Sequence, residues 1–176
     1  MLGFISFLVA AGSETTRHGI AQGIRALCAF PRQRELLRTR PELLRSAVEE
    51  ILRWTAPVRA LRRTALRDVE LRGRSVRAGD SLVLLYLSAN RDEEVFEDPQ
   101  AFRVDRRPND HLTFGLGTHF CLGANLARME MRVAIGRTLE RLPDLELDAA
   151  AKPLYFRSSV MNGLDRLPAV FTPRAA

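Results

Sequence analysis

Residues 1–28 carry apolar side chains in the spacing of one long helix. Residues 1–12 are apolar on nearly every side, and a polar stretch follows at residues 13–17. The helical spacing then resumes at Ile20 and Ile24. A helix that is apolar all round belongs in the interior of a larger protein. The apolar run is far shorter than the ~20 residues that a membrane span needs, and no basic residues precede it. We therefore expect one long helix that is buried in the middle of a larger protein, and neither a signal peptide nor a membrane span.

Further helices are predicted where apolar residues recur at helical spacing, at residues 32–38, 42–54, 87–94 and 124–142. The first two follow prolines, whose fixed backbone angle suits a first helical turn. The last is amphipathic, with arginine and glutamate between its apolar positions.

Short strands are predicted at residues 58–64, 69–72, 75–77, 81–86, 145–147 and 167–171. Residues 96–109 are rich in proline, aspartate and arginine, which predicts ordered irregular chain. No linker divides the sequence, so residues 1–176 are expected to be one domain or part of one. The predicted fold class is mainly α with small β-sheets (α+β).

The chain is basic, with a formal net charge of +6 that comes almost wholly from arginine. The arginines run from Arg17 to Arg174 without a basic cluster and alternate with acids, so nucleic-acid binding is not expected. A basic surface equally suits an acidic protein that delivers electrons. The two cysteines, Cys28 and Cys121, lie far apart and lack the spacing of a zinc site. We expect no disulfide, a cytoplasmic protein, and Cys28 in the core.

Residues 114–123 read Phe-Gly-Leu-Gly-Thr-His-Phe-Cys-Leu-Gly and carry the strongest chemical signal of the chain. Gly115 and Gly117 let the backbone fold tightly around a sulfur atom or a flat ligand. Cys121 precedes the predicted helix at residues 124–142, whose positive end favours a thiolate. The pattern predicts a thiolate that binds metal. Taken alone, a single cysteine among apolar residues is also compatible with an inert core position.

The motif Phe-Gly-x-Gly-x-His-x-Cys-x-Gly resembles the haem-binding loop of the cytochrome P-450 family, the haem-thiolate monooxygenases. The resemblance implies haem b (iron protoporphyrin IX) as the cofactor, with Cys121 as the proximal ligand of the iron. It implies that His119 contacts a haem propionate. It also implies that Phe114, Gly115 and Gly123 lie against the cofactor.

The first helix contains an unusual polar element, Ala-Gly-Ser-Glu-Thr at residues 11–15, within an otherwise apolar run. The Thr15 hydroxyl can bond the carbonyl of Ala11, and we expect this bond to open the helix locally and widen a groove. A simpler alternative is a helix cap around the serine, with an exposed Glu14. The family resemblance implies an oxygen-binding groove beside Ala11 and Gly12 on the distal face of the haem, with Glu14 and Thr15 as catalytic proton relays.

Glu50 and Arg53 are three residues apart and therefore share one face of a predicted helix. Such a pair is usually a solvated surface pair. The resemblance instead implies a buried network in which Arg106 is the third member and which supports the cysteine loop. The segment departs from the commoner family pattern, because Arg103 stands where an acid is usual.

Haem propionates need cationic or donor partners. By resemblance to bacterial members of the family, Arg63 and His111 match positions that contact the propionates. Arg62 is an alternative to Arg63.

The resemblance covers essentially all of residues 1–176, yet chains of the family are more than twice as long. It implies the C-terminal portion of the cytochrome P-450 fold, with the N-terminal half absent. Three origins stay open: a truncated gene product, a mispredicted start and one piece of a split protein, for which the N-terminal half would be a partner.

The implied activity is hydroxylation of a small apolar organic substrate with O2 and two electrons, supplied by NAD(P)H through a reductase and a ferredoxin. The substrate would lie beside Val9, Ala10 and residues 58–61. We expect turnover to fail without the first half. The alternative is a non-catalytic haem-binding remnant or interaction fragment, and an arginine-rich nucleic-acid module is a weaker third hypothesis.

Overall fold

The structure, a computed structural model, describes residues 2–172. Its helices are α1 (Leu2–Ala29), α2 (Pro31–Thr39), α3 (Leu44–Thr55), α4 (Tyr86–Ala89) and α5 (Ala124–Arg141), with short 3-10 helices η1 (Pro41–Leu43) and η2 (Gly117–His119). Its strands are β1 (Ala60–Thr64), β2 (Val69–Leu71), β3 (Arg74–Val76), β4 (Ser81–Leu85), β5 (Glu146–Leu147), β6 (Leu154–Tyr155), β7 (Leu164–Arg166) and β8 (Ala169–Val170). The predicted α+β class is confirmed.

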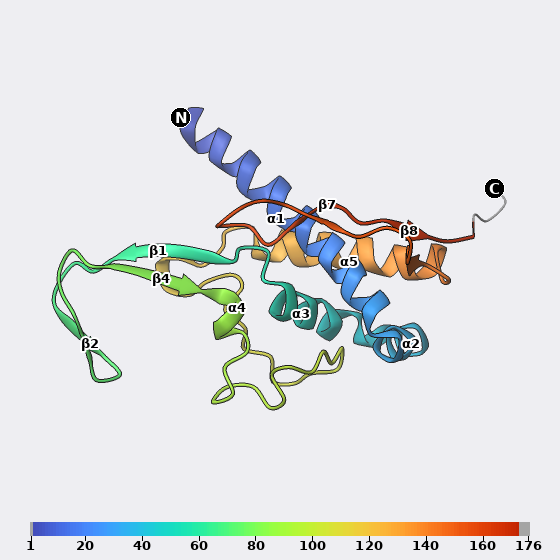
Figure 1. The fold of residues 1–176 in the computed structure, drawn as a ribbon, viewed down its shortest axis with the longest axis horizontal. Helices are drawn as coiled ribbons and strands as arrows, with labels where there is room; N and C mark the ends of the chain where they lie inside the picture. Colours follow the sequence, from blue (N-terminus) through green and yellow to red (C-terminus); the bar gives the residue numbers. More distant parts are fainter. Residues whose placement is uncertain (1, 173–176) are drawn as a thin grey trace.

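The core lies where the second half of α1 crosses α3 and α5 (Figure 1). Glycines in α1 allow this close approach. A Cβ atom at Gly23 would lie 2.8 Å from the Ile51 side chain, and one at Gly19 would lie 3.3 Å from Pro57. The buried apolar cluster comprises Ala26, Leu27, Leu37, Ala47, Val48, Ile51, Leu52, Phe102, Val104, Met131 and Ile135. Burial of these side chains is the main stabilising contribution to the fold.

The first turns of α1 differ from expectation. The helix is continuous, as predicted, but its apolar beginning is exposed, with Leu2, Phe4, Phe7 and Val9 at 82%, 61%, 67% and 64%. Figure 1 shows this part of α1 extending away from the other helices. The expectation of a buried helix concerned a larger protein, and within the described residues these apolar turns are not covered. Over those same residues, no helix has the combined length and hydropathy of a membrane span.

The strands form four antiparallel pairs in the described part of the chain: β1 with β4, β2 with β3, β5 with β8 and β6 with β7. The β1 and β4 strands form a ribbon that extends to one side, with β2 near its far end (Figure 1). The first predicted strand is shorter than expected, and Val58 instead forms an isolated bridge with Met161. The predictions did not include β6 and β7. The brief helix expected at residues 87–94 is only α4, and turns follow it.

Candidate haem-thiolate site

A glycine-rich loop brings Cys121 to the start of α5. Gly115 and Gly117 have φ angles of 72° and 68°, which glycine adopts without the steric penalty of a side chain. The Cys121 N–H donates to the Phe114 carbonyl oxygen at 2.9 Å and closes the loop. The Ala124 N–H donates to the Cys121 carbonyl oxygen at 3.2 Å. The loop therefore leads directly into the first turn of α5.

The Cys121 side chain is a free thiol on an exposed and largely apolar part of the surface. Its neighbours in sequence, Leu116, Phe120 and Leu122, are 78%, 52% and 84% exposed. A Cβ atom at Gly123 would lie 4.0 Å from the Cys121 sulfur, so glycine keeps that side of the sulfur open. The thiol is thus placed to meet a large apolar ligand.

A thiolate is a soft ligand that suits iron. Among residues 2–172, no group of three or more His, Cys, Asp or Glu side chains could hold a metal ion. A single accessible thiol between exposed apolar side chains suits a metal that is carried by a flat organic macrocycle.

The polar element of α1 lies within a continuous helix. The Thr15 hydroxyl donates to the Ala11 carbonyl oxygen at 2.7 Å, the bond expected from the sequence. The expected opening of the helix is not seen, because a carbonyl oxygen can accept a second hydrogen bond without losing the first. Nothing lies within 4 Å of a Cβ atom built on Gly12, so the surface beside it is open. Glu14 accepts a hydrogen bond from Arg17 at 2.6 Å.

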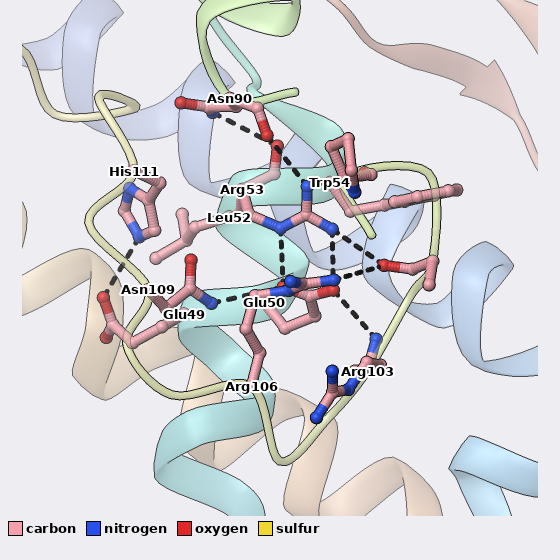
Figure 2. Close-up of polar contacts among 12 residues, drawn as sticks. Glu49, Glu50, Leu52, Arg53, Trp54, Asn90, Arg103, Arg106, Asn109 and His111 are labelled. Carbon is pink, nitrogen blue, oxygen red and sulfur yellow. Dashed lines mark hydrogen bonds and ion pairs between the residues drawn. The ribbon is translucent and has the colours of Figure 1, made fainter. Parts of the chain in front are cut away.

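Glu50, Arg53 and Arg106 meet in a buried site (Figure 2). Arg53 donates to both Glu50 oxygens at 2.7 and 2.8 Å, and Arg106 donates to Glu50 Oε2 at 3.1 Å. Glu50 and Arg53 are fully buried and Arg106 is 4% exposed. The surface-pair alternative therefore does not hold for Glu50 and Arg53. The Arg103 side chain points away from Glu50, toward Glu97 at 3.6 Å. Only the backbone N–H of Arg103 donates to Glu50. This is why an arginine is accommodated where the family commonly has an acid.

The two buried arginines also hold the irregular segment that precedes the cysteine loop. Arg53 donates to the carbonyl oxygens of Asn90, Pro99 and Ala101 at 2.8 to 2.9 Å. Arg106 donates to Ala101 as well, at 2.8 Å. Further bonds from Arg106 reach the carbonyl oxygens of Glu97 and Asp98. Backbone groups of an irregular segment lack partners from a helix or sheet, so these side chains supply them.

Sequence reasoning missed Asn90, which joins α3 to the start of the cysteine loop. Asn90 is fully buried. Its amide donates to the Arg53 carbonyl oxygen at 3.1 Å and to the Thr113 hydroxyl at 2.9 Å, and its Oδ1 accepts from the Leu112 N–H at 2.8 Å. The Thr113 hydroxyl in turn donates to the Leu52 carbonyl oxygen at 2.8 Å. No local sequence pattern marks an asparagine whose partners lie so far along the chain.

His111, which is predicted to contact a propionate, is held by contacts within the protein. Its side chain is 2% exposed, and both ring nitrogens are used within the protein. Nε2 lies 3.1 Å from Glu49 Oε2, and Nδ1 accepts from the Thr113 N–H at 3.3 Å. Figure 2 shows the ring directed toward Glu49. His111 therefore anchors the chain before the cysteine loop to α3.

Glu49 and Arg128 complete this second cluster and were also missed. Arg128 donates to both Glu49 oxygens at 2.8 and 2.9 Å, and its guanidinium lies 4.5 Å from the centre of the Phe114 ring. Burial raises the pKa of Glu49, but the hydrogen bonds from His111 and Arg128 outweigh burial and lower this pKa to about 2. The cluster thus connects α3, α5 and the aromatic residue that opens the cysteine loop.

The remaining predicted contacts are on exposed or half-buried surface. His119 is exposed at the end of η2, and Arg63 is half-buried in β1. Arg63 donates to the carbonyl oxygen of Arg62. Arg62 itself is an exposed residue. Neighbouring residues of a strand point to opposite faces, so only one of these two arginines can face the same ligand. The hydrogen bond between Thr15 and Ala11 joins two residues of α1.

Comparison with known proteins places the whole arrangement in context. A family model described as Cytochrome P450 matches residues 32–161. The Steroid C26-monooxygenase of Mycobacterium tuberculosis (strain H37Rv) is 47% identical over 167 residues, which cover 94% of this chain and 42% of that relative. The Methyl-branched lipid omega-hydroxylase of the same strain is 46% identical over 171 residues, which cover 96% of this chain and 40% of that relative.

Solved structures agree with this assignment. Substrate-free CYP109E1 from Bacillus megaterium matches with a TM-score of 0.93 and 39% identity, over 98% of this chain and 45% of that chain. The same protein in complex with testosterone matches with a TM-score of 0.91 and 39% identity, over 96% of this chain and 47% of that chain. The chain thus spans less than half the length of these relatives. From the matched residues, the cysteine loop and the shared fold, we conclude that the chain belongs to the cytochrome P450 family.

Proposed function

We propose that residues 1–176 form the C-terminal part of a single cytochrome P450 domain and carry the haem-thiolate site of a bacterial monooxygenase. The observation that carries this proposal is the free, exposed Cys121 thiol, held by a glycine loop against a rigid buried network. Because the chain spans less than half of its relatives, the activity of the whole protein belongs to this proposal.

The residues of the loop would hold haem b. Cys121 would supply the thiolate ligand, and Phe114, Gly115 and Gly123 would lie beside the ring system. His119 is an exposed donor that could pair with a propionate, and Arg63 or its neighbour Arg62 would pair with another. Two clusters support this arrangement, one around Glu50 and one around Glu49, because they fix the segments on either side of the loop.

When bound, haem supplies the oxygen-activating and electron-accepting chemistry by which one oxygen atom of O2 enters a C–H bond. The chain would manage protons through Glu14 and Thr15. The Thr15 hydroxyl donates a hydrogen bond to the Ala11 carbonyl oxygen, which leaves the hydroxyl oxygen free to accept a hydrogen bond from water. The Glu14 side chain is 43% exposed, so it can exchange protons with solvent. The open surface beside Gly12 leaves room for a small ligand.

The substrate would be apolar and would lie against Val9, Ala10 and residues 58–61. Val9 is 64% exposed and Leu61 is 38% exposed, so both offer apolar contact area. The names of the relatives specify a steroid and a methyl-branched lipid, which favours a lipid substrate for this chain. Electrons would come from NAD(P)H through a reductase and a ferredoxin in the cytoplasm, and the basic net charge would favour an acidic carrier.

The absorption spectrum of the reduced, CO-bound protein after haem loading tests the proposal. We expect the absorption band typical of a thiolate-ligated haem. The band should be lost in Cys121→Ala and kept in Cys28→Ala, because Cys28 is half-buried in the helical core. A band that persists without Cys121, or no haem binding by the wild-type chain, would overturn the assignment.

A second candidate is a non-catalytic haem-binding or interaction fragment, which the exposed apolar turns of α1 favour. We expect the chain alone to show the spectrum without turnover. Hydroxylated steroid formed by the purified chain with NAD(P)H, reductase and ferredoxin would contradict that expectation and support a complete catalyst. The absence of product together with the thiolate band would support the fragment.

A further inference from the structure

A buried histidine lies one helical turn after Glu14. His18 is fully buried in α1, and its ring lies tilted by 33° against the Phe156 ring, with the ring centres 5.1 Å apart. The segment that leads into β7 covers it closely, because a Cβ atom at Gly163 would lie 2.5 Å from Cγ and Cε1 of the ring. A polar ring that is buried so tightly needs partners for its nitrogens.

The contacts of His18 fix which nitrogen carries the proton. The Leu164 N–H donates to Nδ1 at 3.3 Å, so Nδ1 uses its lone pair as an acceptor. In a neutral imidazole the other nitrogen then carries the hydrogen. Protonation of Nδ1 would break the bond from Leu164. The backbone of β7 therefore selects a neutral ring with its N–H at Nε2.

Glu14 lies close to that nitrogen, but the N–H is not aligned with the carboxylate. His18 Nε2 lies 3.3 Å from Glu14 Oε2, the same oxygen that accepts from Arg17 at 2.6 Å. Nε2 makes no aligned hydrogen bond within residues 2–172 in this arrangement. A buried donor without a partner is costly, and a small rotation of the partly exposed Glu14 carboxylate would satisfy it.

We propose that His18 is a positioning residue for Glu14, and that it presents a fixed Nε2–H donor which holds the carboxylate on the α1 surface. The inference rests on the proposed function, in which Glu14 exchanges protons. A neutral donor restrains the carboxylate without adding a second positive charge beside Arg17. Glu14 thereby keeps a defined orientation on the α1 surface.

The charges that face His18 come from α1 and β7. Burial lowers the pKa of His18, and the positive charge of Arg17 lowers it further. The negative charges of Glu14 and of Asp165 in β7 act in the opposite direction and raise this pKa. Phe156 of the neighbouring segment adds no charge. Each of the two nearest charges can be removed by one isosteric or near-isosteric substitution.

Nitrogen-15 NMR of histidine-labelled protein without haem tests the inference. His18 is identified as the signal that is lost in His18→Asn. We expect the shifts of an Nε2–H tautomer at neutral pH. Glu14→Gln should lower the His18 pKa by at least about half a unit, because a carboxylate oxygen of Glu14 lies 3.3 Å from Nε2. Arg17→Gln should raise the His18 pKa, because it removes a positive charge.

Glu35→Gln is the matched control, because Glu35 forms an exposed pair with Arg38 at the same i, i+3 spacing as Glu14 with Arg17. This substitution should leave the His18 signal unchanged. An Nδ1–H tautomer, or equal effects of Glu14→Gln and Glu35→Gln, would overturn the inference. The measurement needs no haem, so failure of the CO-bound spectrum would refute the proposed function while leaving the contact between His18 and Glu14 intact.

Discussion

Glu50 accepts five hydrogen bonds in a fully buried site, which makes Glu50→Gln a sharp perturbation. Arg53 donates two of these bonds, and the Arg103 N–H, the Arg106 guanidinium and the Asn109 amide donate one each, at 2.7 to 3.2 Å. Glutamine keeps the shape of the side chain. It removes the negative charge, however, and it turns one acceptor atom into a donor that faces other donors.

The expected loss of stability follows from these contacts. Hydrogen bonds to a charged group contribute about 1.5–3 kcal/mol each, and removal of one partner from a buried ion pair costs about 3–5 kcal/mol. The substitution would leave the buried Arg53 and the nearly buried Arg106 without their counter-charge. We therefore expect a loss of about 3–5 kcal/mol, a large part of the roughly 5–15 kcal/mol of a typical domain.

Urea unfolding followed by far-ultraviolet circular dichroism measures this effect. A loss of that size lowers the midpoint by about 2 M when the slope is about 2 kcal/mol/M. Amide hydrogen exchange gives an independent signal, because the residues around Ala101 would lose part of the hydrogen bonding that fixes them. Glu35→Gln is again the control, since its exposed pair with Arg38 should not move the midpoint measurably.

Two outcomes would refute the reasoning. A Glu50→Gln midpoint within about 0.5 M of the wild type would mean that the buried carboxylate is not needed for stability. An equal shift in Glu35→Gln would mean that loss of any glutamate charge, and not the buried network, causes the effect.

Two further predictions concern the second cluster and the ring pocket. The hydrogen bonds from His111 and Arg128 hold the folded-state pKa of Glu49 at about 2, below its ordinary 4.5, so this stabilisation is complete above pH 4.5 and is lost as the pH falls toward 2. Urea titrations at each pH measure this effect. Over that range the free energy of unfolding of the wild type should fall by about 2 kcal/mol more than that of Glu49→Gln, after allowance for the partial exposure of the carboxylate. Equal losses would contradict the assignment. Gly163→Ala should destabilise by about 1–3 kcal/mol, because the added methyl group overlaps the His18 ring. Thermal unfolding should show a fall of about 2–4 °C per kcal/mol, and an unchanged transition would show that the pocket can relax.

Local sequence rules accounted for the helices and for the cysteine loop. The 3.6-residue period predicted α1 and α5 because each side chain position on a helix is fixed by the backbone alone. The loop was recognisable because only glycine readily takes the positive φ angles of Gly115 and Gly117. The same logic overestimated α4, since the side chain of Asn90 bonds to segments far along the chain and the helix stops before it. The pair β6 and β7 is too short for a two-residue period to be visible.

The sequence by itself therefore determined which segments are helical, where the thiol lies along the chain and which acid and base share a face of α3. Only the tertiary structure decided which charges are compensated in the interior. Glu49 and Glu50 are adjacent in sequence, yet one pairs with Arg128 of α5 and the other with Arg106 of the irregular segment. Likewise, the proton position on His18 depends on the Leu164 backbone. Backbone periodicity is a local property, whereas the partners of a buried polar group depend on segments that only folding brings together.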